Sequence, residues 1–427
     1  MTRTDIPDSQ LIQSLVQTDK KTGIDTLAGV GFGEGGVKAT LEHIEYSHID
    51  ENPYPVYAWL RSNAPVAYLP RIGAWYVSRY EDVQRILTDP ENFTVTFPGS
   101  TIIDTFGEMM LTTDGELQRY YRNRLVQQTF APAVIRQRLA ARIGTRIDQL
   151  ISGFEPDGAA DLRAGFASRL PILVMLDLFG FTDDDETLFR GWYNSFEAAL
   201  ANVMGDERIR AAGTGSAAEF HDYFQAQVDK VRLDPVDGFL NDMLSAPEQE
   251  RHRDDEIRRN ALVIFFGGIS TVEALILNAL WALLKHPVAF DCARGKPGNI
   301  DGVIDETMRW RAPVHTAFRL AVNETEVAGV RLPEGAFVVP LIASANRDES
   351  VYEAAGEFRP QRRQTPPHLG FATGPHLCLG RHMAKLEAHA ALEAILARLP
   401  NLRLAEDVEP RGAEFHQVRS LEVVWEV

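Results

Sequence analysis

The chain has 427 residues, of which 45% are hydrophobic and 24% are charged, a composition typical of globular proteins. Its formal net charge of −17 disfavours a nucleic acid as partner. No stretch of about 18 apolar residues is free of charge and glycine, and the first residues, MTRTDIPDSQ, lack the apolar core of a signal peptide. We therefore expect a cytoplasmic protein with no membrane segment, long enough for one large domain or two or three ordinary ones.

The first 50 residues differ in character from the rest. They include GVGFGEGG, which matches Gly31-x-Gly33-x-x-Gly36, a pattern found in dinucleotide-binding loops. No convincing strand precedes it and no β-α-β unit follows, so a flexible glycine-rich segment is the better interpretation. We expect residues 1–50 to form a partly flexible extension and residues 51–427 to form a single domain.

From residue 52 onward the patterns predict mostly helices. In chain order we expect a helix over 55–62, strands over 66–68 and 75–78, a helix over 81–87, an irregular apolar segment over 93–113, helices over 115–152, 160–178, 184–204 and 207–231, a long helix over 254–286, strands over 325–341, a helix over 379–398 and a β-rich tail. The predicted fold class is mainly α with small β-sheets (α+β).

The long central helix, from Asp254 to His286, contains no proline and is apolar nearly all round in its middle, ALVIFFGGISTVEALILNALWALL. Such a helix is buried on most of its faces. Gly267 and Gly268 each cost about 1 kcal/mol relative to alanine in mid-helix, so we expect a tight helix crossing or a flat ligand against the backbone to offset that cost. The Thr271 hydroxyl is expected to bond the Gly267 carbonyl, which either leaves a polar notch in an apolar wall or simply satisfies a buried threonine.

The chain contains two cysteines, Cys292 and Cys378. They lie too far apart for a CxxC zinc or redox motif, and Cys292 lies in a loop-like stretch. Cys378 lies at the expected start of a helix, where free amides and the helix dipole favour a thiolate, and Gly380 allows a turn that places amides near the sulfur. On these residues alone, Cys378 is either a metal ligand or a nucleophile with His376 as its base.

The segment Phe371-Ala-Thr-Gly-Pro-His376-Leu-Cys378-Leu-Gly380 resembles the cysteine-ligand signature of the cytochrome P450 superfamily, with Ala372 in place of the first glycine. The resemblance implies haem b (iron protoporphyrin IX) between the central helix and the cysteine loop, with Cys378 as the axial ligand of the iron. It also implies that Phe371 packs beside the sulfur, that His376 bonds a haem propionate, and that Gly380 belongs to the cofactor-binding loop.

Three further segments resemble motifs of the same family, in the same order. Glu306-Thr-Met-Arg309 is similar to its Glu-x-x-Arg pair, and Phe358-Arg-Pro-Gln-Arg362 is similar to the segment that supplies a third, basic partner. Thr316-Ala-Phe-Arg319 is similar to the strand whose arginine meets a propionate. The resemblance implies structural roles for Glu306, Arg309 and Arg362.

The segment from Asp114 to Arg122 is similar to the family's helix carrying His-x-x-x-Arg, with Gln118 in place of the histidine. The resemblance, which covers about residues 50–427, thus implies haem contacts for Arg319, Arg122 and Gln118, the last with a changed side chain.

Gly267-Gly268-Ile-Ser270-Thr271 is similar to the family's Ala-Gly-x-Glu/Asp-Thr, in which the acid and the threonine relay protons to iron-bound dioxygen. The resemblance implies catalytic roles for these two glycines, Ser270 and Thr271. Serine cannot donate a proton as a carboxylic acid does, although it can pass protons along a hydrogen-bonded chain. Glu273 lies about 200° around the helix from Thr271 and is not expected to take over directly.

The resemblance therefore implies a bacterial, soluble haem-thiolate monooxygenase that inserts one atom of dioxygen into a small hydrophobic molecule. No flavin or iron–sulfur module is visible in the sequence, so electrons are expected from NAD(P)H through a ferredoxin and its reductase. The expected pocket is mostly apolar, with His315 as a polar contact unless it is a structural histidine. Its predicted lining is Phe97, Ile103, Phe106, Val263, Phe266, Val314, His315 and Val418.

A cluster of arginines is the candidate docking face for an acidic partner, with a solvated helix surface as the alternative. These residues are Arg119, Arg122, Arg124, Arg136, Arg138, Arg142 and Arg146. Two other functions stay open: a peroxide-using or non-hydroxylating haem-thiolate oxidase, because Ser270 replaces the acid, and a non-catalytic haem binder or sensor.

Overall fold

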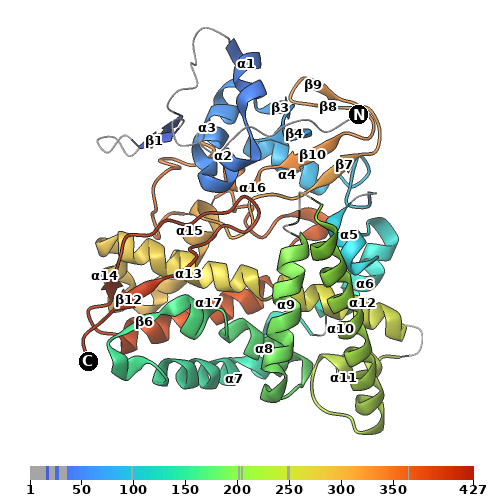
Figure 1. The fold of residues 1–427 in the computed structure, drawn as a ribbon, viewed down its shortest axis with the longest axis vertical. Helices are drawn as coiled ribbons and strands as arrows, with labels where there is room; N and C mark the ends of the chain where they lie inside the picture. Colours follow the sequence, from blue (N-terminus) through green and yellow to red (C-terminus); the bar gives the residue numbers. More distant parts are fainter. Residues whose placement is uncertain are drawn as a thin grey trace.

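Helices make up most of the computed structural model, and the five-stranded sheet lies at one end of it (Figure 1). The structure describes residues 16–18, 25–27, 36–97, 100–127, 129–200, 202, 205–247, 251–363 and 365–427. The predicted fold class, mainly α with small β-sheets, is confirmed. Most of the predicted extension, including Gly31 and Gly33 of the glycine-rich pattern, lies outside the described residues.

Residues near the end of the N-terminal segment pack against later parts of the chain. Strands β1 (Val16–Thr18) and β2 (Asp25–Leu27) pair with each other, and helices α1 (Gly36–His43), α2 (Tyr46–Glu51) and α3 (Pro53–Asn63) follow. Ile44 and Ile49 are buried in one apolar cluster with residues of α3. The backbone carbonyl and the carboxylate of Asp50 accept hydrogen bonds from the amides of Gly412 and Ala413. Residues of this segment thus contact later parts of the chain, and the domain boundary at residue 51 stays a prediction.

The main sheet has the strand order β3-β4-β10-β7-β5. Its strands are β3 (Val66–Leu69), β4 (Ala74–Val77), β10 (Phe337–Pro340), β7 (Arg319–Ala321) and β5 (Phe93–Thr94), with β10 parallel to β4 and the other pairs antiparallel. Helix α4 (Tyr80–Thr88) packs on this sheet, and β8 (Thr325–Val327) and β9 (Val330–Leu332) form a hairpin beside it. The sheet thereby places Arg319 at the first position of β7.

The helical body forms the opposite end of the molecule, drawn mostly in green in Figure 1. It starts with α5 (Thr101–Phe106) and α6 (Gly115–Gln127), then α7 (Pro132–Ser152), η2 (Glu155–Asp157), β6 (Ala159–Asp161), η3 (Arg163–Ala167), α8 (Leu170–Phe179) and η4 (Asp183–Asp185). It continues with α9 (Glu186–Leu200), α10 (Glu207–Leu233) and α11 (Phe239–Leu244). The helix predicted over 115–152 is two helices, because Pro132, which lacks a backbone N–H, begins the second one.

The last third of the chain completes the core. It comprises α14 (Pro287–Gly295), η6 (Pro297–Asn299), α15 (Ile300–Trp310), α16 (Ile342–Ala345), η7 (Gly374–His376), α17 (Arg381–Arg398), β11 (Arg403–Leu404) and β12 (Glu422–Val424), where β11, β12 and β6 form a sheet. Cys292 lies in α14 rather than in the loop that we expected.

The predicted central helix consists of α12 (Asp254–Gly267) and α13 (Ser270–Lys285), which meet at a break over Gly268 and Ile269. By length and composition it is the one described segment apolar enough to cross a membrane, but 83% of its most apolar window is buried within the protein. Figure 1 shows α13 (yellow) between the sheet end and the green helices, with α17 alongside. It is therefore the core helix that the sequence predicted, and its break is the first feature of the candidate site.

Candidate functional site

The two glycines at the helix break have different surroundings. Gly267 is exposed in the middle of a buried helix, and a Cβ added to it would meet no atom within 4 Å. A Cβ added to Gly268 would lie 2.2 Å from the Cε atom of Met175 on α8. Of the two explanations offered for the glycines, tight helix crossing applies to Gly268, whereas Gly267 leaves open space against the backbone for a ligand.

Thr271 forms the hydrogen bond that its spacing predicted. Its Oγ1 donates to the carbonyl oxygen of Gly267 at 2.7 Å, at an exposed position. The hydroxyl and the carbonyl therefore lie together at the surface of the open space beside Gly267, which makes this bond part of a polar notch rather than of the packed core.

Ser270 and Glu273 lie on a different, buried part of the same helix turn. Ser270 is 1% exposed, and its hydroxyl has no hydrogen-bond partner of normal geometry among the described residues. Glu273 accepts a hydrogen bond from Nε of Arg163 at 2.6 Å. Burial raises the pKa of the Glu273 carboxyl, although Arg163 opposes that shift. Glu273 is thus paired with Arg163 and not with Thr271, in agreement with the angular argument from the sequence.

The cysteine loop is held in a turn that ends at the start of α17. The amide of Cys378 donates to the carbonyl of Phe371 at 2.9 Å. Burial raises the pKa of the Cys378 thiol, while hydrogen bonds from the amides of Gly380 and Arg381 and the charge of Arg122 lower it. The amides predicted from the helix start are therefore in place, and they act against the effect of burial.

Two residues of this loop have left-handed backbone conformations. Gly374 has φ of +71°, and a Cβ on it would lie 2.7 Å from the carbonyl oxygen of Leu87, so only glycine fits. Ala372, where the family signature has glycine, has φ of 56° and therefore carries the steric strain that a Cβ creates in this region.

Helix α6 is tied to the cysteine loop by two short hydrogen bonds. Nε2 of Gln118 donates to the carbonyl of Pro375 at 2.6 Å, and Nη2 of Arg122 donates to the carbonyl of Leu377 at 2.6 Å. These bonds use one donor group of each side chain to fix the loop, a role that the sequence did not reveal for either residue.

His376 is paired with a carboxylate that the sequence analysis did not single out. Its Nε2 lies 2.9 Å from Oδ1 of Asp114, and Oδ2 of Asp114 accepts bonds from Thr94 Oγ1 and the Val95 amide. Burial alone would raise the pKa of Asp114, but the hydrogen bonds from His376, Val95 and Thr94 hold it below its usual value. The bond expected from His376 to a propionate can therefore involve only Nδ1. The signal that was missed is the place of Asp114 directly before helix α6.

Arg319 is a buried cation with no carboxylate within ion-pair distance among the described residues. It is 5% exposed, and its Nη1 donates to the carbonyl of Phe318 at 2.8 Å. Burial lowers the pKa of its guanidinium to about 10, with the charge of Asp114 opposing the shift. A buried cation of this kind fits an anionic group such as a propionate.

The predicted pocket residues fall into two groups. Phe106 and Phe266 lie with ring centroids 5.6 Å apart, and Val263 lies one turn before Phe266 on α12. Ile103 and Val314 keep part of their surface open, as does Phe97, whose ring lies 5.6 Å from that of Phe337. Phe415, which the sequence analysis missed, is half-buried with its ring 6.2 Å from that of Phe266.

Two of the predicted pocket residues have no surface that a ligand reaches. His315 and Val418 are both 0% exposed. The ring of His315 stacks on His416 at 4.5 Å and contacts Tyr54, and burial lowers its pKa to about 3. His315 is thus the structural histidine that was the alternative, and Val418 is a core residue.

Three arginines of the basic region predicted as a docking face, Arg138, Arg142 and Arg146, lie beside aspartates. Arg138 pairs with Asp242 at 2.7 Å, and Arg146 pairs with Asp177 and Asp183 at 3.0 and 2.7 Å. Arg142 also lies 3.6 Å from Asp177. Exposed Arg119 remains, and with Arg122 and Pro375 it lines a pocket of about 320 Å³ beside the cysteine loop. Arg136 of α7 is exposed as well, so the docking face over residues 119–146 stays a prediction, with Arg119 as its member beside the cysteine loop.

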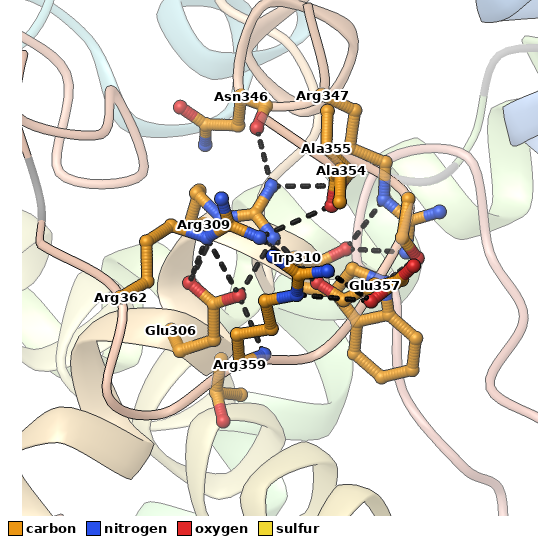
Figure 2. Close-up of polar contacts among 12 residues, drawn as sticks. Glu306, Arg309, Trp310, Asn346, Arg347, Ala354, Ala355, Glu357, Arg359 and Arg362 are labelled. Atoms are coloured by element: carbon orange, nitrogen blue, oxygen red, sulfur yellow. Dashed lines mark hydrogen bonds and ion pairs between the residues drawn. The ribbon is translucent and has the colours of Figure 1, made fainter. Parts of the chain in front are cut away.

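Glu306, Arg309 and Arg362 form a buried ion-pair network. Figure 2 shows both oxygens of Glu306 directed at Arg309, at 2.7 and 2.9 Å, with Arg362 bound to the same carboxylate at 3.1 Å. Arg309 also donates to three backbone carbonyls, those of Asn346, Ala355 and Glu357. The three charged residues that the sequence assigned to one structural group thus lie together.

An open space against Gly267, a partly open thiol at Cys378 and a buried cation at Arg319 fit one flat, anionic group bound through sulfur. Fold and site together define the haem-thiolate class of protein. A model of the cytochrome P450 family matches residues 300–412.

Relatives extend this match over most of the chain. Cytochrome P450(MEG) of Priestia megaterium is 30% identical over 373 residues, which cover 82% of this chain and 90% of that protein. The steroid C26-monooxygenase of Mycobacterium tuberculosis is 30% identical over 352 residues, covering 82% and 87%. The structure of a cytochrome P450 from Chondromyces apiculatus superposes with a TM-score of 0.80 at 26% identity, covering 90% and 97%. The chain belongs to the cytochrome P450 family and is a P450 monooxygenase. Membership of this family implies that it uses haem.

Proposed function

We propose that this P450 inserts one atom of dioxygen into a hydrophobic organic small molecule in the cytoplasm, with electrons from NAD(P)H through a ferredoxin and its reductase. The observation that carries the proposal is the polar notch of Gly267 and Thr271, beside open space on a helix that also carries the apolar side chains of Val263 and Phe266. Haem b, when bound, supplies the thiolate-ligated iron that reduces dioxygen with two electrons and two protons.

The residues of the chain have distinct roles in this proposal. Cys378 would hold the haem iron through its sulfur, Arg319 and His376 would hold propionates, and Phe371 would pack beside the sulfur. Arg122 and Gln118 hold the loop and keep further donors for the haem edge. Because Thr271 donates its proton to the Gly267 carbonyl, the lone pairs of Oγ1 are free to accept a hydrogen bond from the open side.

The ligand role of Cys378 has a direct spectroscopic test. The reduced protein with carbon monoxide is expected to show the thiolate-haem Soret band, and Cys378→Ala is expected to abolish it. Cys292→Ala, at a cysteine in α14 away from the loop, is the matched control and should keep the band. Retention of the band in Cys378→Ala would overturn the assignment.

The substrate class is tested by a spectral-shift screen of small organic ligands. One relative is named a steroid C26-monooxygenase, so steroids belong in the panel beside fatty acids and macrolides. Phe106→Ala should weaken the binding of any ligand that shifts the Soret band, since Phe106 packs on Phe266 of the central helix. Val418→Ala, at a fully buried core position, should leave the dissociation constant unchanged. Equal effects of the two substitutions would place the pocket elsewhere.

The redox partner is tested by charge reversal at Arg119. Arg119→Glu should slow reduction by ferredoxin and flatten its dependence on salt, because the long-range attraction of an acidic partner is lost. Arg403→Glu is the control, on an exposed residue of β11 in the sheet that Figure 1 shows on the opposite side of the molecule from α6. Equal reduction rates in the two variants would exclude Arg119 from the docking surface.

The buried hydroxyl of Ser270, in the place of an acid, keeps a second reaction open. Product formation driven by peroxide that exceeds product formation with the reductase system would favour a peroxide-using enzyme, and the reverse result would favour the monooxygenase reaction with an external reductase.

A further inference from the structure

Tyr193 of α9 lies against the helix turn that carries Ser270. Its ring stacks on that of Phe266, with centroids 6.5 Å apart and ring planes 26° apart. Phe266 lies at the end of α12 and Ser270 is the first residue of α13, so the two lie on either side of the break in the central helix. Tyr193 is itself buried.

Two hydroxyls at this place lack full hydrogen bonds. Neither Oη of Tyr193 nor Oγ of Ser270 has a partner of normal geometry among the described residues. A buried polar group left unsatisfied costs about 1–3 kcal/mol, so two neighbouring ones call for a reason. Hydrogen bonds that serve catalysis are often long in the ligand-free protein and shorten when the site is filled.

The Tyr193 hydroxyl is electrostatically coupled to Ser270 and to two carboxylates. Burial raises the pKa of Tyr193 well above its ordinary value, Glu197 and Glu273 raise it further, and Ser270 acts in the opposite direction as a hydrogen-bonding neighbour. Tyr193 therefore stays neutral at working pH. A neutral hydroxyl moves a proton by accepting one and releasing its own, without becoming a phenolate.

The far end of this cluster reaches solvent. Glu197 is one helical turn beyond Tyr193 on α9 and is partly exposed. Beside it, Glu273 has a side chain 2% exposed and is bound to Arg163, whose side chain is 31% exposed. The ion pair with Arg163 holds the side chain of Glu273 in place. Glu197 is the carboxylate that is exposed to solvent.

We propose that Tyr193 and Glu197 replace the acid that is missing at position 270, by relaying protons from solvent through Ser270 to the open space beside Gly267. Glu197 takes a proton from water and passes it to Oη of Tyr193, whose own proton moves to Oγ of Ser270. Ser270 then releases its original proton toward its chain neighbour Thr271, whose Oγ1 lies at the notch beside Gly267. Both hydroxyls end neutral and Glu197 is recharged from solvent, so no proton is gained or lost by the chain. The relay rests on the proposed monooxygenase reaction.

The first experiment compares Tyr193→Phe with Tyr57→Phe. Both substitutions remove only a buried hydroxyl that lacks a partner of normal geometry, but Tyr57 lies on α3 in another apolar cluster. With a reductase system, Tyr193→Phe should lower product formed per NAD(P)H by about tenfold, release the difference as hydrogen peroxide, and enlarge the solvent deuterium isotope effect. Ligand-induced Soret shifts should stay as in the unsubstituted protein. Equal coupling in the two variants would overturn the relay.

The second experiment is rescue by an acid. Ser270→Asp restores a carboxylic acid on the central helix, so it should return coupling to the Tyr193→Phe protein. A role of the Tyr193 hydroxyl in packing alone predicts no such rescue, and that result would contradict the proposal.

The third experiment needs no turnover and so separates this proposal from the proposed function. The free energies of unfolding of Tyr193→Phe, Ser270→Ala and the double variant should be non-additive, because the relay requires the two hydroxyls to be coupled. Tyr57→Phe combined with Ser270→Ala should be additive. Additive unfolding energies for Tyr193→Phe and Ser270→Ala would overturn the relay, whether or not a substrate is found. Failure of the Cys378 test with non-additivity retained would instead refute only the haem chemistry.

Discussion

Gly268 lies directly against Met175, such that a Cβ on the glycine would be 2.2 Å from Cε of the methionine. Its neighbour Gly267 meets no atom within 4 Å of the same added carbon. The two glycines are adjacent in the chain but have different roles. Gly268 allows close helix packing, and Gly267 leaves the backbone accessible.

Alanine substitution should separate these purposes. Gly268→Ala should lower the free energy of unfolding by about 1–3 kcal/mol, toward the lower end because the end of Met175 is flexible. Met175→Ala in the same chain should relieve part of that overpacking. Gly267→Ala should leave the apoprotein as stable or more stable by up to about 1 kcal/mol and should keep haem bound, because the family motif has alanine at this position. Urea unfolding and the haem-to-protein absorbance ratio measure the two effects, and a loss of apoprotein stability in Gly267→Ala would contradict this assignment.

Ala372→Gly should stabilise the protein. Ala372 holds φ of 56°, a region in which a Cβ costs about 1–2 kcal/mol. Glycine removes that strain but gains freedom in the unfolded chain, so we expect a net gain of about 1 kcal/mol in unfolding free energy. The matched control is Ala397→Gly, an exposed position in helix α17, where glycine should cost up to about 1 kcal/mol. Melting temperatures that fall in both variants would show that the loop turn is not strained.

The buried Glu306–Arg309 pair should be far more sensitive than its exposed neighbour. Arg309→Lys loses the forked contact with Glu306 and carbonyl contacts, and we expect a cost of about 3–5 kcal/mol in unfolding free energy. Arg359→Lys alters a surface pair with Glu357, where the arginine side chain is 45% exposed and the expected cost is below about 1 kcal/mol. The backbone bond from Arg359 to Glu306 is kept in that control. Similar denaturation midpoints for the two variants would be incompatible with the network in Figure 2.

Glu387 should make the folded protein less stable as pH rises. It is fully buried on α17, neither carboxylate oxygen has a hydrogen-bond partner among the described residues, and burial raises its pKa well above the usual value. Above about pH 4.5, where the unfolded chain loses this proton and the folded protein keeps it, unfolding becomes easier by about 1.4 kcal/mol per pH unit, until the folded pKa is reached. Glu387→Gln should therefore gain stability over the unsubstituted protein, by more at pH 8 than at pH 6.

Glu393→Gln, an exposed position on the same helix, is the control for this measurement and should show no such growing difference. A stability difference for Glu387→Gln that is constant between pH 6 and pH 8 would mean that Glu387 is already ionised in the folded protein.

The short-range patterns of the sequence predicted the elements well, because they depend on residues close together in the chain. The apolar run around Gly267 predicted a buried helix, and the spacing of Thr271 predicted its bond to the carbonyl four residues back. The Glu306–Arg309 contact could be predicted for the same reason, since residues three apart share a helix face.

Contacts between distant segments were not accessible in this way. The Asp114–His376 pair joins residues 262 positions apart, and only the folded chain brings them together. Arg138 and Arg146 on α7 looked like part of a free basic face because their partners, Asp242 and Asp177, come from other parts of the chain. His315 looked available to a ligand because nothing local indicated that Tyr54 and His416 enclose it.

The two bonds from α6 to the cysteine loop have a consequence for how the chain tolerates recombination. Gln118 and Arg122 donate hydrogen bonds to main-chain carbonyls of the loop. These bonds depend on the backbone conformation of the loop and not on its side chains. A chimera that takes residues 371–380 from a relative whose loop follows another path would lose both anchors at once. In a chimera, residues 115–127 and 371–380 should therefore come from the same parent protein.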